Sequence, residues 1–288
     1  LSAGYLDSAT GHWVLTPSQL AGLKFTPPHD DSGTFQLTVT AVSRESSNAD
    51  RATTSRTLSI EVAPVSDAPA ISATAATALE DQAANLSIDA AVTDLVGTGE
   101  VITALRVTVP AGFTLSGGTS LGNGVYDLTG LSAHARAALK LTPPANYSGT
   151  VTLTVEAASQ DGTAAPAWST RSVSVTYTAV ADAPNVTAHD ATGAEDTPIA
   201  LTLSASLVDT DGSETMAVIL SGLPAGAVLN HGSNNGDGSW TLKPSELTGL
   251  TVTPPRNYSG GMDLTLTATS LESSNRTRRA RQPTSMSP

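Results

Sequence analysis

Carboxylate side chains gather in three short stretches of the last third of the chain, and their spacing supports metal chemistry. Glu195 and Asp196 precede an apolar run, the sequence Asp-Thr-Asp-Gly-Ser-Glu at 209–214 follows it, and Glu272 with Asn275 follows a later alternating stretch. Carboxylates packed together repel one another unless a cation neutralises them. Ca²⁺ accepts about six to eight oxygen ligands in flexible geometry, so calcium binding is the chemistry these stretches predict.

The candidate ligands fall into three groups. The first five are Glu195, Asp196, Asp209, Asp211 and Glu214. The second group is Asp182, Glu272 and Asn275. Weaker candidates lie earlier in the chain: Glu80, Asp81, Asp94, Glu45, Asn48, Asp50 and Asp67. The alternative is that these acids are solvated loop residues, as most surface Asp and Glu side chains are.

Other reactive constellations are missing from the sequence. The five His residues do not occur at zinc-site spacing, and no Gly-x-Ser-x-Gly nucleophile motif is present. Paired carboxylates could serve a glycosidase, but no aromatic-lined cleft is indicated. We therefore expect no catalytic activity.

The chain repeats itself at the spacing of a small domain. Thr-Pro-Pro occurs at residues 26, 142 and 253, in steps of 116 and 111 residues. Asp-Ala-Pro at 67–69 returns at 182–184, a step of 115 residues. Such steps predict an array of similar domains. We place a partial, C-terminal half repeat at 1–66, a complete repeat at 67–181, and a repeat with an aberrant or missing last strand at 182–288.

Both ends of the sequence depart from the repeat. The first residues align with the middle of the third unit, through Trp13 against Trp240, so we expect a piece of a longer repeat protein. After Asn275 the alternation gives way to a basic segment, Arg276–Arg281. That tail is either a functional anion-binding segment or the product of a frame change or artificial terminus, and we favour the second interpretation.

Composition excludes several classes of partner. Lys and Arg number 14 against 26 Asp and Glu, a net charge of −12, which argues against nucleic acid binding. Cys is absent, so disulfides and thiolate metal sites are impossible. No run of about 18 apolar residues occurs, so we expect no membrane span in this sequence.

Alternating apolar and polar residues predict short antiparallel strands. Phe35, Leu37 and Val39 alternate with Gln36, Thr38 and Thr40, and the same pattern recurs at 151–157 and 262–268. Turn sequences separate further strands expected near 199–207, 215–221, 239–243 and 250–253, and 244–250 is expected to hold a helical turn. The fold class is therefore all-β: tandem immunoglobulin/cadherin-like Greek-key β-sandwich repeats of about 115 residues.

In such a sandwich, the loop after the second strand and the loop before the last strand lie at one pole, close to the entry linker. We therefore expect all candidate ligands of the third unit to converge at the pole that faces the preceding unit. The second unit keeps Glu80, Asp81 and Asp94 but has Val96 in place of Asp211, so we expect a weaker or absent site there.

The repeat motifs resemble the cadherin-like and immunoglobulin-like tandem repeats of large bacterial RTX-type surface adhesins. The matching stretches are Gly193–Ile199, Asp209–Glu214, Leu223–Ala227, Gly238–Trp240, Asn257–Gly260 and Ala181–Pro184. The resemblance implies an extracellular or bacterial cell-surface extender with Ca²⁺ at its junctions, in cell adhesion or biofilm formation. Its partners would be neighbouring repeats of the same chain, and surface glycans or proteins through other regions. The alternative is a carbohydrate- or protein-binding β-sandwich module of a secreted protein.

Overall fold

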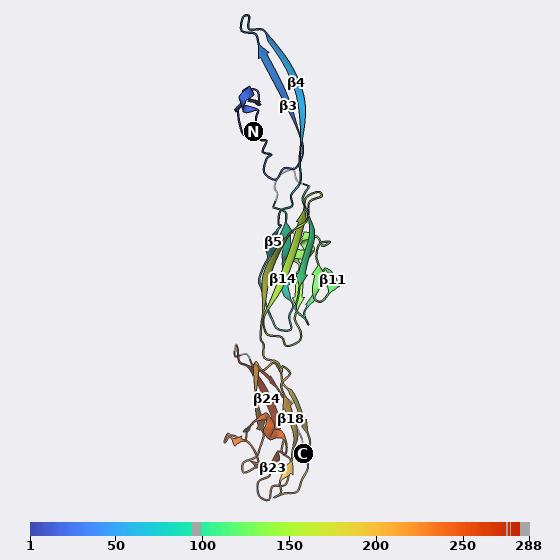
Figure 1. The fold of residues 1–288 in the computed structure, drawn as a ribbon. Helices are drawn as coiled ribbons and strands as arrows, with labels where there is room; N and C mark the ends of the chain where they lie inside the picture. Colours follow the sequence, from blue (N-terminus) through green and yellow to red (C-terminus); the bar gives the residue numbers. More distant parts are fainter. Residues whose placement is uncertain (94–98, 275, 277, 283–288) are drawn as a thin grey trace.

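The computed structural model describes residues 1–93, 99–274, 276 and 278–282. The ranges 1–66, 67–181 and 182–288 are called the first, second and third units below. No sheet of the described residues joins strands from two of these ranges. The units follow one another in a row, with the first unit at one end (Figure 1). The division at these residue numbers stays a prediction of the sequence.

The first unit consists of two hairpins. Its elements are β1 (Tyr5–Asp7), β2 (His12–Val14), the 3₁₀ helix η1 (Pro17–Gln19), β3 (Gly33–Arg44) and β4 (Arg51–Val62). Strands β3 and β4 pair over their whole length, in the antiparallel register that sets Phe35 opposite Ile60. Most of their side chains are exposed, including Val39, Val42 and Leu58.

The second unit is a complete two-layer sandwich. Its strands are β5 (Ala70–Ala73), β6 (Ala76–Leu79), β7 (Ala84–Leu86), β8 (Ile88–Ala91), β9 (Val101–Thr108), β10 (Thr114–Leu115), β11 (Thr119–Gly122), β12 (Val125–Asp127), β13 (Leu139–Thr142), β14 (Gly149–Gln160) and β15 (Ala167–Thr178), with the short helix α1 (Ala133–Ala137). One sheet has the order β11-β12-β9-β14-β15-β6, and β10-β13-β7 faces it. Alternate residues of β14 and β15, among them Leu153, Val155 and Val175, fill the space between the layers.

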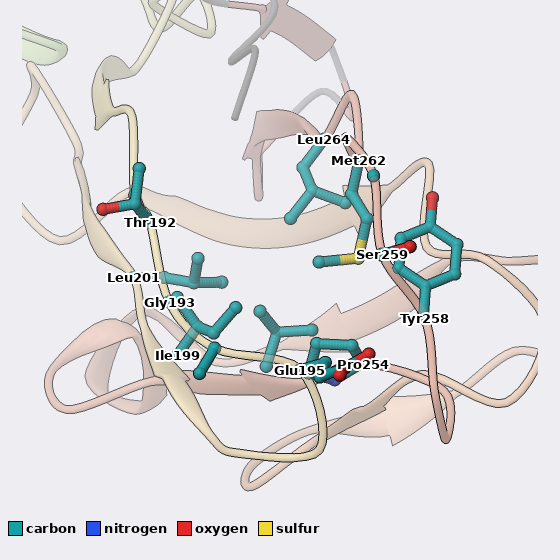
Figure 2. A pocket seen from close by; sticks show the side chains of 14 residues that line it. Thr192, Gly193, Glu195, Ile199, Leu201, Pro254, Tyr258, Ser259, Met262 and Leu264 are labelled. Carbon is teal, nitrogen blue, oxygen red and sulfur yellow. The ribbon is translucent and has the colours of Figure 1, made fainter.

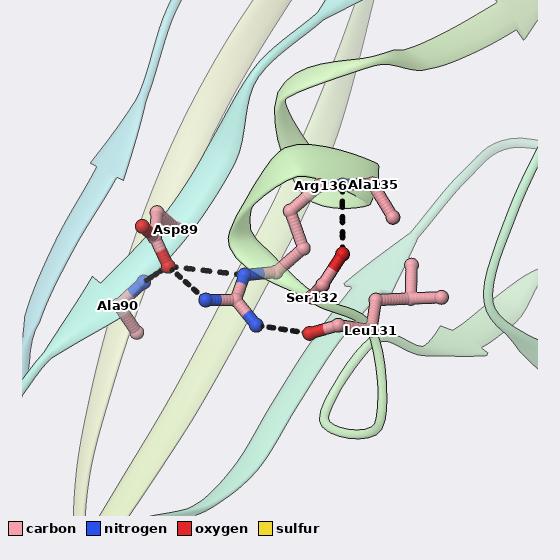
Figure 3. A network of polar contacts seen from close by, with 6 residues as sticks. All are labelled: Asp89, Ala90, Leu131, Ser132, Ala135 and Arg136. Atoms are coloured by element: carbon pink, nitrogen blue, oxygen red, sulfur yellow. Dashed lines mark hydrogen bonds and ion pairs between the residues drawn. The ribbon is translucent and has the colours of Figure 1, made fainter.

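Helix α1 is fixed to the sandwich by an ion pair. Ser132 caps the helix by accepting a hydrogen bond from the Ala135 N–H at 3.2 Å. The Arg136 guanidinium lies 2.7 Å from an Asp89 carboxylate oxygen on β8 and also donates to the Leu131 carbonyl (Figure 3). The ion pair therefore holds the helix against β8 of the second unit.

The third unit repeats this plan with a shorter main sheet. Its elements are β16 (Asn185–His189), β17 (Ile199–Ala200), β18 (Thr202–Ser206), β19 (Glu214–Ser221), β20 (Val228–Leu229), β21 (Ser233–Asn234), β22 (Trp240–Leu242), the 3₁₀ helix η2 (Pro244–Leu247), β23 (Thr251–Thr253), β24 (Thr265–Glu272) and β25 (Arg278–Arg281). The main sheet has the order β21-β22-β19-β24-β25, opposite β17-β23-β20. Trp240 lies in the core at 8% exposure, whereas Trp13, at the matching position of the first unit, is exposed.

The structure is all-β and forms sandwiches, as the alternating pattern predicts. Two details of the third unit differ from the sequence interpretation. The alternation at 262–268 becomes strand only from Thr265, and the basic segment forms the short strand β25, which pairs with Ala268–Leu271. A strand of four residues therefore stands where β15 has twelve.

Candidate metal site at the junction of the second and third units

The linker between the second and third units is held by carboxylates on both sides. Glu80, which directly follows β6, accepts a hydrogen bond from the Val180 N–H through Oε1. Glu214, the first residue of β19, accepts from the Asp182 N–H at 2.6 Å. The Ser270 hydroxyl on β24 donates to the Asp182 carbonyl. Acidic side chains from two units therefore meet at one short linker.

The loop at 209–213 folds around its own carboxylates. Asp209 Oδ1 accepts from the Asp211 N–H at 2.9 Å, and Asp211 Oδ1 accepts from the Ser213 N–H at 2.7 Å. Asp and Asn favour such turns because their side chains reach the backbone two residues on. Gly212 has a φ of 93°, a conformation that residues with a Cβ rarely adopt.

The second unit also touches this loop directly. The Ser148 hydroxyl donates to Asp211 Oδ2 at 3.0 Å, and the Asn146 side-chain amide donates to the Val208 carbonyl at 3.2 Å. The Asn146 N–H in turn donates to Asp81 Oδ1 at 2.8 Å. The turn that follows Thr-Pro-Pro in one unit thus contacts the acidic loop of the next.

Four acidic side chains at this junction are almost fully buried. They are Glu80, Asp209, Glu214 and Glu272, whose exposed fractions are 4%, 2%, 7% and 0%. Among the described residues, the Oε2 atoms of all three glutamates have no hydrogen-bond partner. A buried carboxylate oxygen without a partner is costly, so it points to a group that would satisfy it.

Burial and neighbouring charges raise the pKa of two glutamates at the junction, Glu80 and Glu214. Burial raises the pKa of Glu80, although the hydrogen bond from the Val180 N–H lowers it. The charges of Asp209, Asp182 and Asp81 raise this pKa further. Burial and then the charges of Asp182, Asp209 and Glu272 raise the pKa of Glu214, while the Asp182 N–H opposes the shift.

Asp182 and Asp211 have opposite shifts. Burial, Asp81 and Asp209 raise the pKa of Asp182, and Arg279 on β25 lowers it. The pKa of Asp211 is lowered, first by its hydrogen bond with the Ser213 side chain. Carboxylates whose ionisation is resisted by their neighbours favour a nearby cation.

The residues fit calcium in chemistry but do not form a closed cage. Hard oxygen donors with bare buried lone pairs are the donor set that Ca²⁺ takes. Across the described residues, however, no three His, Asp or Glu side chains are grouped as a preformed metal site. Ligation by this set would therefore require side-chain adjustment.

Glu195 and Asp196 do not join this junction, contrary to the expected convergence. Asp196 Oδ1 accepts from the Asn257 N–H at 2.8 Å, and Glu195 lies with Tyr258 beside a pocket at the other end of the unit (Figure 2). Strand β24 (Thr265–Glu272) runs between the two poles. Its last residue, Glu272, pairs with Glu214 and so lies at the junction. The hydrogen bond of Asp196 copies that of Asp81, so Glu195 and Asp196 match Glu80 and Asp81 one unit along.

Three of the remaining candidates lie in the first unit, away from this junction. Glu45, Asn48 and Asp50 form the exposed turn between β3 and β4, where Asp50 accepts at its carbonyl from the Glu45 N–H at 2.8 Å. Glu272 lies at the junction, and its Oε1 accepts from the Ser274 N–H at 2.8 Å. Asp94 and Asn275 lie outside the described residues.

A similar arrangement lies at the junction of the first and second units, where the sequence predicted a weaker or absent site. The Asp67 N–H donates to Glu100 at 2.8 Å, and the Ser159 hydroxyl donates to the Asp67 carbonyl. Glu100 and Asp161 are buried at 6% and 4% exposure, and Glu100 Oε2 has no partner within the described part of the chain.

Sequence reasoning did not select Glu100 and Asp161 as ligands. Their positions beside strands could have identified them. Glu100 directly precedes β9, much as Glu214 begins β19, and Asp161 directly follows β14, much as Glu272 ends β24.

Comparisons with known proteins find similar solved structures but show no family. No protein-family model matches the chain, and no curated protein matches it. The extracellular domain of protocadherin gamma B4 is 12% identical, with 88% of this chain covered, 36% of that chain covered and a TM-score of 0.38. Mouse cadherin-23 repeats EC22–24 are 13% identical, with coverages of 91% and 76% and a TM-score of 0.40. The Yersinia pseudotuberculosis adhesin InvE is 13% identical, with coverages of 76% and 58% and a TM-score of 0.22.

Each TM-score is below 0.5, so these similarities indicate nothing about function. The fold is assigned from the sheets described above. The chain spans about a third of the length of the protocadherin structure. In the described residues, no helix has the length and apolar character needed to cross a membrane.

Proposed function

We propose that this chain is a non-catalytic extender of a large bacterial cell-surface or secreted adhesin, stiffened by Ca²⁺ at the junctions between its units. The observation that supports it most is the set of three buried glutamates with bare Oε2 atoms around one linker. Carboxylates from both adjoining units face that linker, so a shared cation would restrict the angle between the units.

The proposed ligands are Glu80, Asp81, Asp182, Asp209, Asp211, Glu214 and Glu272. A bound Ca²⁺ would neutralise their mutual repulsion. Extracellular calcium modules bind with dissociation constants of about 10⁻⁴–10⁻³ M. At free metal about 100-fold above that constant, binding stabilises the folded state by about 2.7 kcal/mol.

The extracellular location and the role in adhesion or biofilm formation belong to the same proposal. They are supported by the resemblance of the repeat motifs and by the arrangement of the units in a row (Figure 1). A row of β-sheet units suits a spacer that holds a binding region away from a surface.

The test is a calorimetric melt of the chain in Ca²⁺, in Mg²⁺ and in chelator. We expect a rise in Tm that is specific to Ca²⁺ and that is lost in Asp209→Asn, which keeps the Oδ1 acceptor for the Asp211 N–H. The matched control is Glu195→Gln with Asp196→Asn, which changes carboxylates at the other pole and should leave the Ca²⁺ response intact. Identical melts in the three buffers would reject the calcium proposal.

A further inference from the structure

The main sheet of the second unit carries an exposed indole on its outer face. Trp168 of β15 is 50% exposed and pairs with Ala158 of β14, which pairs in turn with Ala104 of β9. Both alanines point away from the core, because the core residues Ala157 and Leu105 are next to them in sequence and strands alternate. They are nevertheless only 1% and 8% exposed. The paired Trp168 is the large side chain placed to cover them.

Arg106 holds the indole in this position. Its guanidinium carbon lies 5.7 Å from the centroid of the Trp168 ring, within the range of a cation–π contact. Strand β14 lies between β15 and β9 in the sheet, so the indole reaches across β14 to meet Arg106. The guanidinium occupies one face of the ring, and the 50% exposure of Trp168 leaves much of the remaining ring surface open to solvent.

A row of polar side chains crosses the sheet beside the indole. The strand registers set Arg106 between Asp127 of β12 and Glu156 of β14. Glu156 lies opposite Thr170 of β15, two residues along the strand from Trp168. Residues directly opposite one another share a face of the sheet. These four side chains, called the polar row below, therefore offer carboxylate, guanidinium, carboxylate and hydroxyl groups in turn.

The polar row contains a hydrogen-bond donor that the protein does not satisfy. Arg106 Nε is buried and has no hydrogen-bond partner within the described part of the chain. Asp127 is held by Thr129 instead, because its Oδ1 accepts from the Thr129 N–H at 2.9 Å and from the Thr129 hydroxyl at 2.6 Å. These hydrogen bonds lower the pKa of Asp127, and the charge of Arg106 lowers it further. A buried donor without an acceptor is costly, so the row is incomplete without an external hydrogen-bonding group.

The described strands of the other units lack this arrangement. In the strand registers, Trp168 corresponds to Thr53 of the first unit and to Ala280 of the third. Arg106 corresponds to Ile219 of the third unit. The third unit forms its main sheet without these side chains, so the fold itself does not require them. They indicate a role that belongs to the second unit alone.

We infer that this face of the second unit is a binding site for a neutral glycan. A pyranose ring has a face of C–H groups, and packing that face on the indole of Trp168 removes apolar surface from water. The hydroxyl groups of a sugar both donate and accept. They therefore pair with the carboxylates of Asp127 and Glu156 and with the guanidinium of Arg106. This site goes beyond the extender role and does not depend on calcium at the linkers.

The charges of the polar row select among ligands. Two carboxylates against one guanidinium leave the row with a net negative charge, which disfavours an anionic sugar. An apolar peptide would cover the indole but would leave the charged groups beside it without partners, which is costly. A neutral sugar presents an apolar face and hydroxyl groups in one ring, and so it suits both parts of the site.

The test is titration calorimetry of the whole chain with a panel of neutral oligosaccharides, the hexasaccharides of glucose, mannose, galactose and N-acetylglucosamine. We expect saturable binding of at least one of them. Trp168→Thr, which introduces the residue of the first unit, should weaken that binding at least about tenfold. The matched control is Trp13→Thr, because Trp13 is also exposed, at 41%, but lies in the first unit. This control should bind as the parent does.

Acrylamide quenching gives a second readout that locates the sugar. In the Trp13→Thr chain, Trp168 is exposed and Trp240 is buried, so the bound oligosaccharide should protect the fluorescence from quenching. Glu156→Thr introduces the residue that the first and third units have at this position, as Thr40 and Thr267. It should weaken binding while the calorimetric transition of the second unit is kept.

Three outcomes would overturn the inference. One is the absence of binding to the parent chain by every oligosaccharide of the panel at millimolar concentration. Another is equal affinity of the parent and Trp168→Thr for the sugar that binds. The third is a preference for a sulfated oligosaccharide or for an apolar peptide over every neutral sugar, because the class of ligand would then be wrong.

Discussion

At the residue scale, each buried glutamate of the main junction has two different oxygens. One accepts a backbone N–H, from Val180, Asp182 or Ser274, and the other is bare. The first oxygen fixes the side chain and the second remains for a ligand. Glu100 repeats this division at the earlier junction, where it accepts from the Asp67 N–H.

Glu214→Gln tests the pKa shifts in the absence of metal. A carboxyl whose pKa is raised on folding holds its proton more firmly in the folded state. The contribution of Glu214 to the free energy of unfolding is therefore most favourable below its unfolded pKa of 4.5. This contribution is lost as the pH rises through the raised pKa of the folded state. In chelator, the parent should lose stability relative to Glu214→Gln as the pH rises above 4.5, as measured by denaturant unfolding. A constant difference between the two chains across this range would contradict the assignment.

Arg279→Ala tests the influence of the basic strand β25 on the junction. Arg279 lowers the pKa of Asp182, so its positive charge acts on the same carboxylate that would attract a cation. Removing it should tighten Ca²⁺ binding about two- to fivefold, because exposed charges contribute less than about 1 kcal/mol. Calcium titration calorimetry measures the change, with Arg281→Ala as the control on the same strand. Equal affinities in the two variants would contradict this role.

The sequence predicted acidic side chains at the junction but not the division of the candidates between the two poles. Asp209, Asp211 and Glu214 follow an apolar run closely enough to be placed together by spacing alone. Glu195 and Asp196 are near them in sequence, yet β17 and β18 run the length of the sandwich between the two groups. Deciding which unit completes the site required the contact from Ser148, 63 residues away from Asp211, which no local pattern encodes.

At the element scale, the alternating pattern predicted where strands form better than it predicted which strands pair. The pattern at 151–157 predicted β14, and the same pattern in the third unit yields strand only from Thr265, where β19 supplies a neighbour. The parallel addition of β6 to β15 was not expected, because its pairing joins residues about 100 positions apart. A strand's apolar face is local information, whereas its hydrogen-bonded edge depends on chain that lies far away in the sequence.

Tyr177→Phe measures how much the last strand of the second unit contributes through one buried contact. Burial raises the pKa of Tyr177 to about 12, and the hydroxyl donates to the Leu141 carbonyl. Losing this hydrogen bond should cost about 1 kcal/mol and leave the carbonyl short of a donor. Calorimetry should show the transition of the second unit lowered by about 4 °C. The control is Tyr258→Phe, whose exposed hydroxyl donates to Gly261, and an equal shift in both would contradict the argument.

At the scale of the whole molecule, the two junctions determine the shape of the chain. The units share no sheet among the described residues, so their relative orientation depends on linkers and on side-chain contacts such as that of Ser148 with Asp211. A short linker containing Pro184 has few accessible conformations, but it does not by itself fix an angle. The buried carboxylates disfavour close approach of the units until their charge is neutralised.

Small-angle scattering of the whole chain tests that dependence. In chelator, repulsion among Glu80, Asp182 and Glu214 should widen the range of angles at the linker, so the average maximum dimension should be shorter than in Ca²⁺. Glu214→Gln combined with Asp209→Asn should remove the difference between the two buffers, because the variant can neither repel as strongly nor hold the ion. The control variant Glu195→Gln with Asp196→Asn should respond as the parent does. If the parent has the same dimensions in both buffers while its Tm still rises with Ca²⁺, the ion stabilises one unit without stiffening the junction, and the extender proposal would lose its mechanical basis.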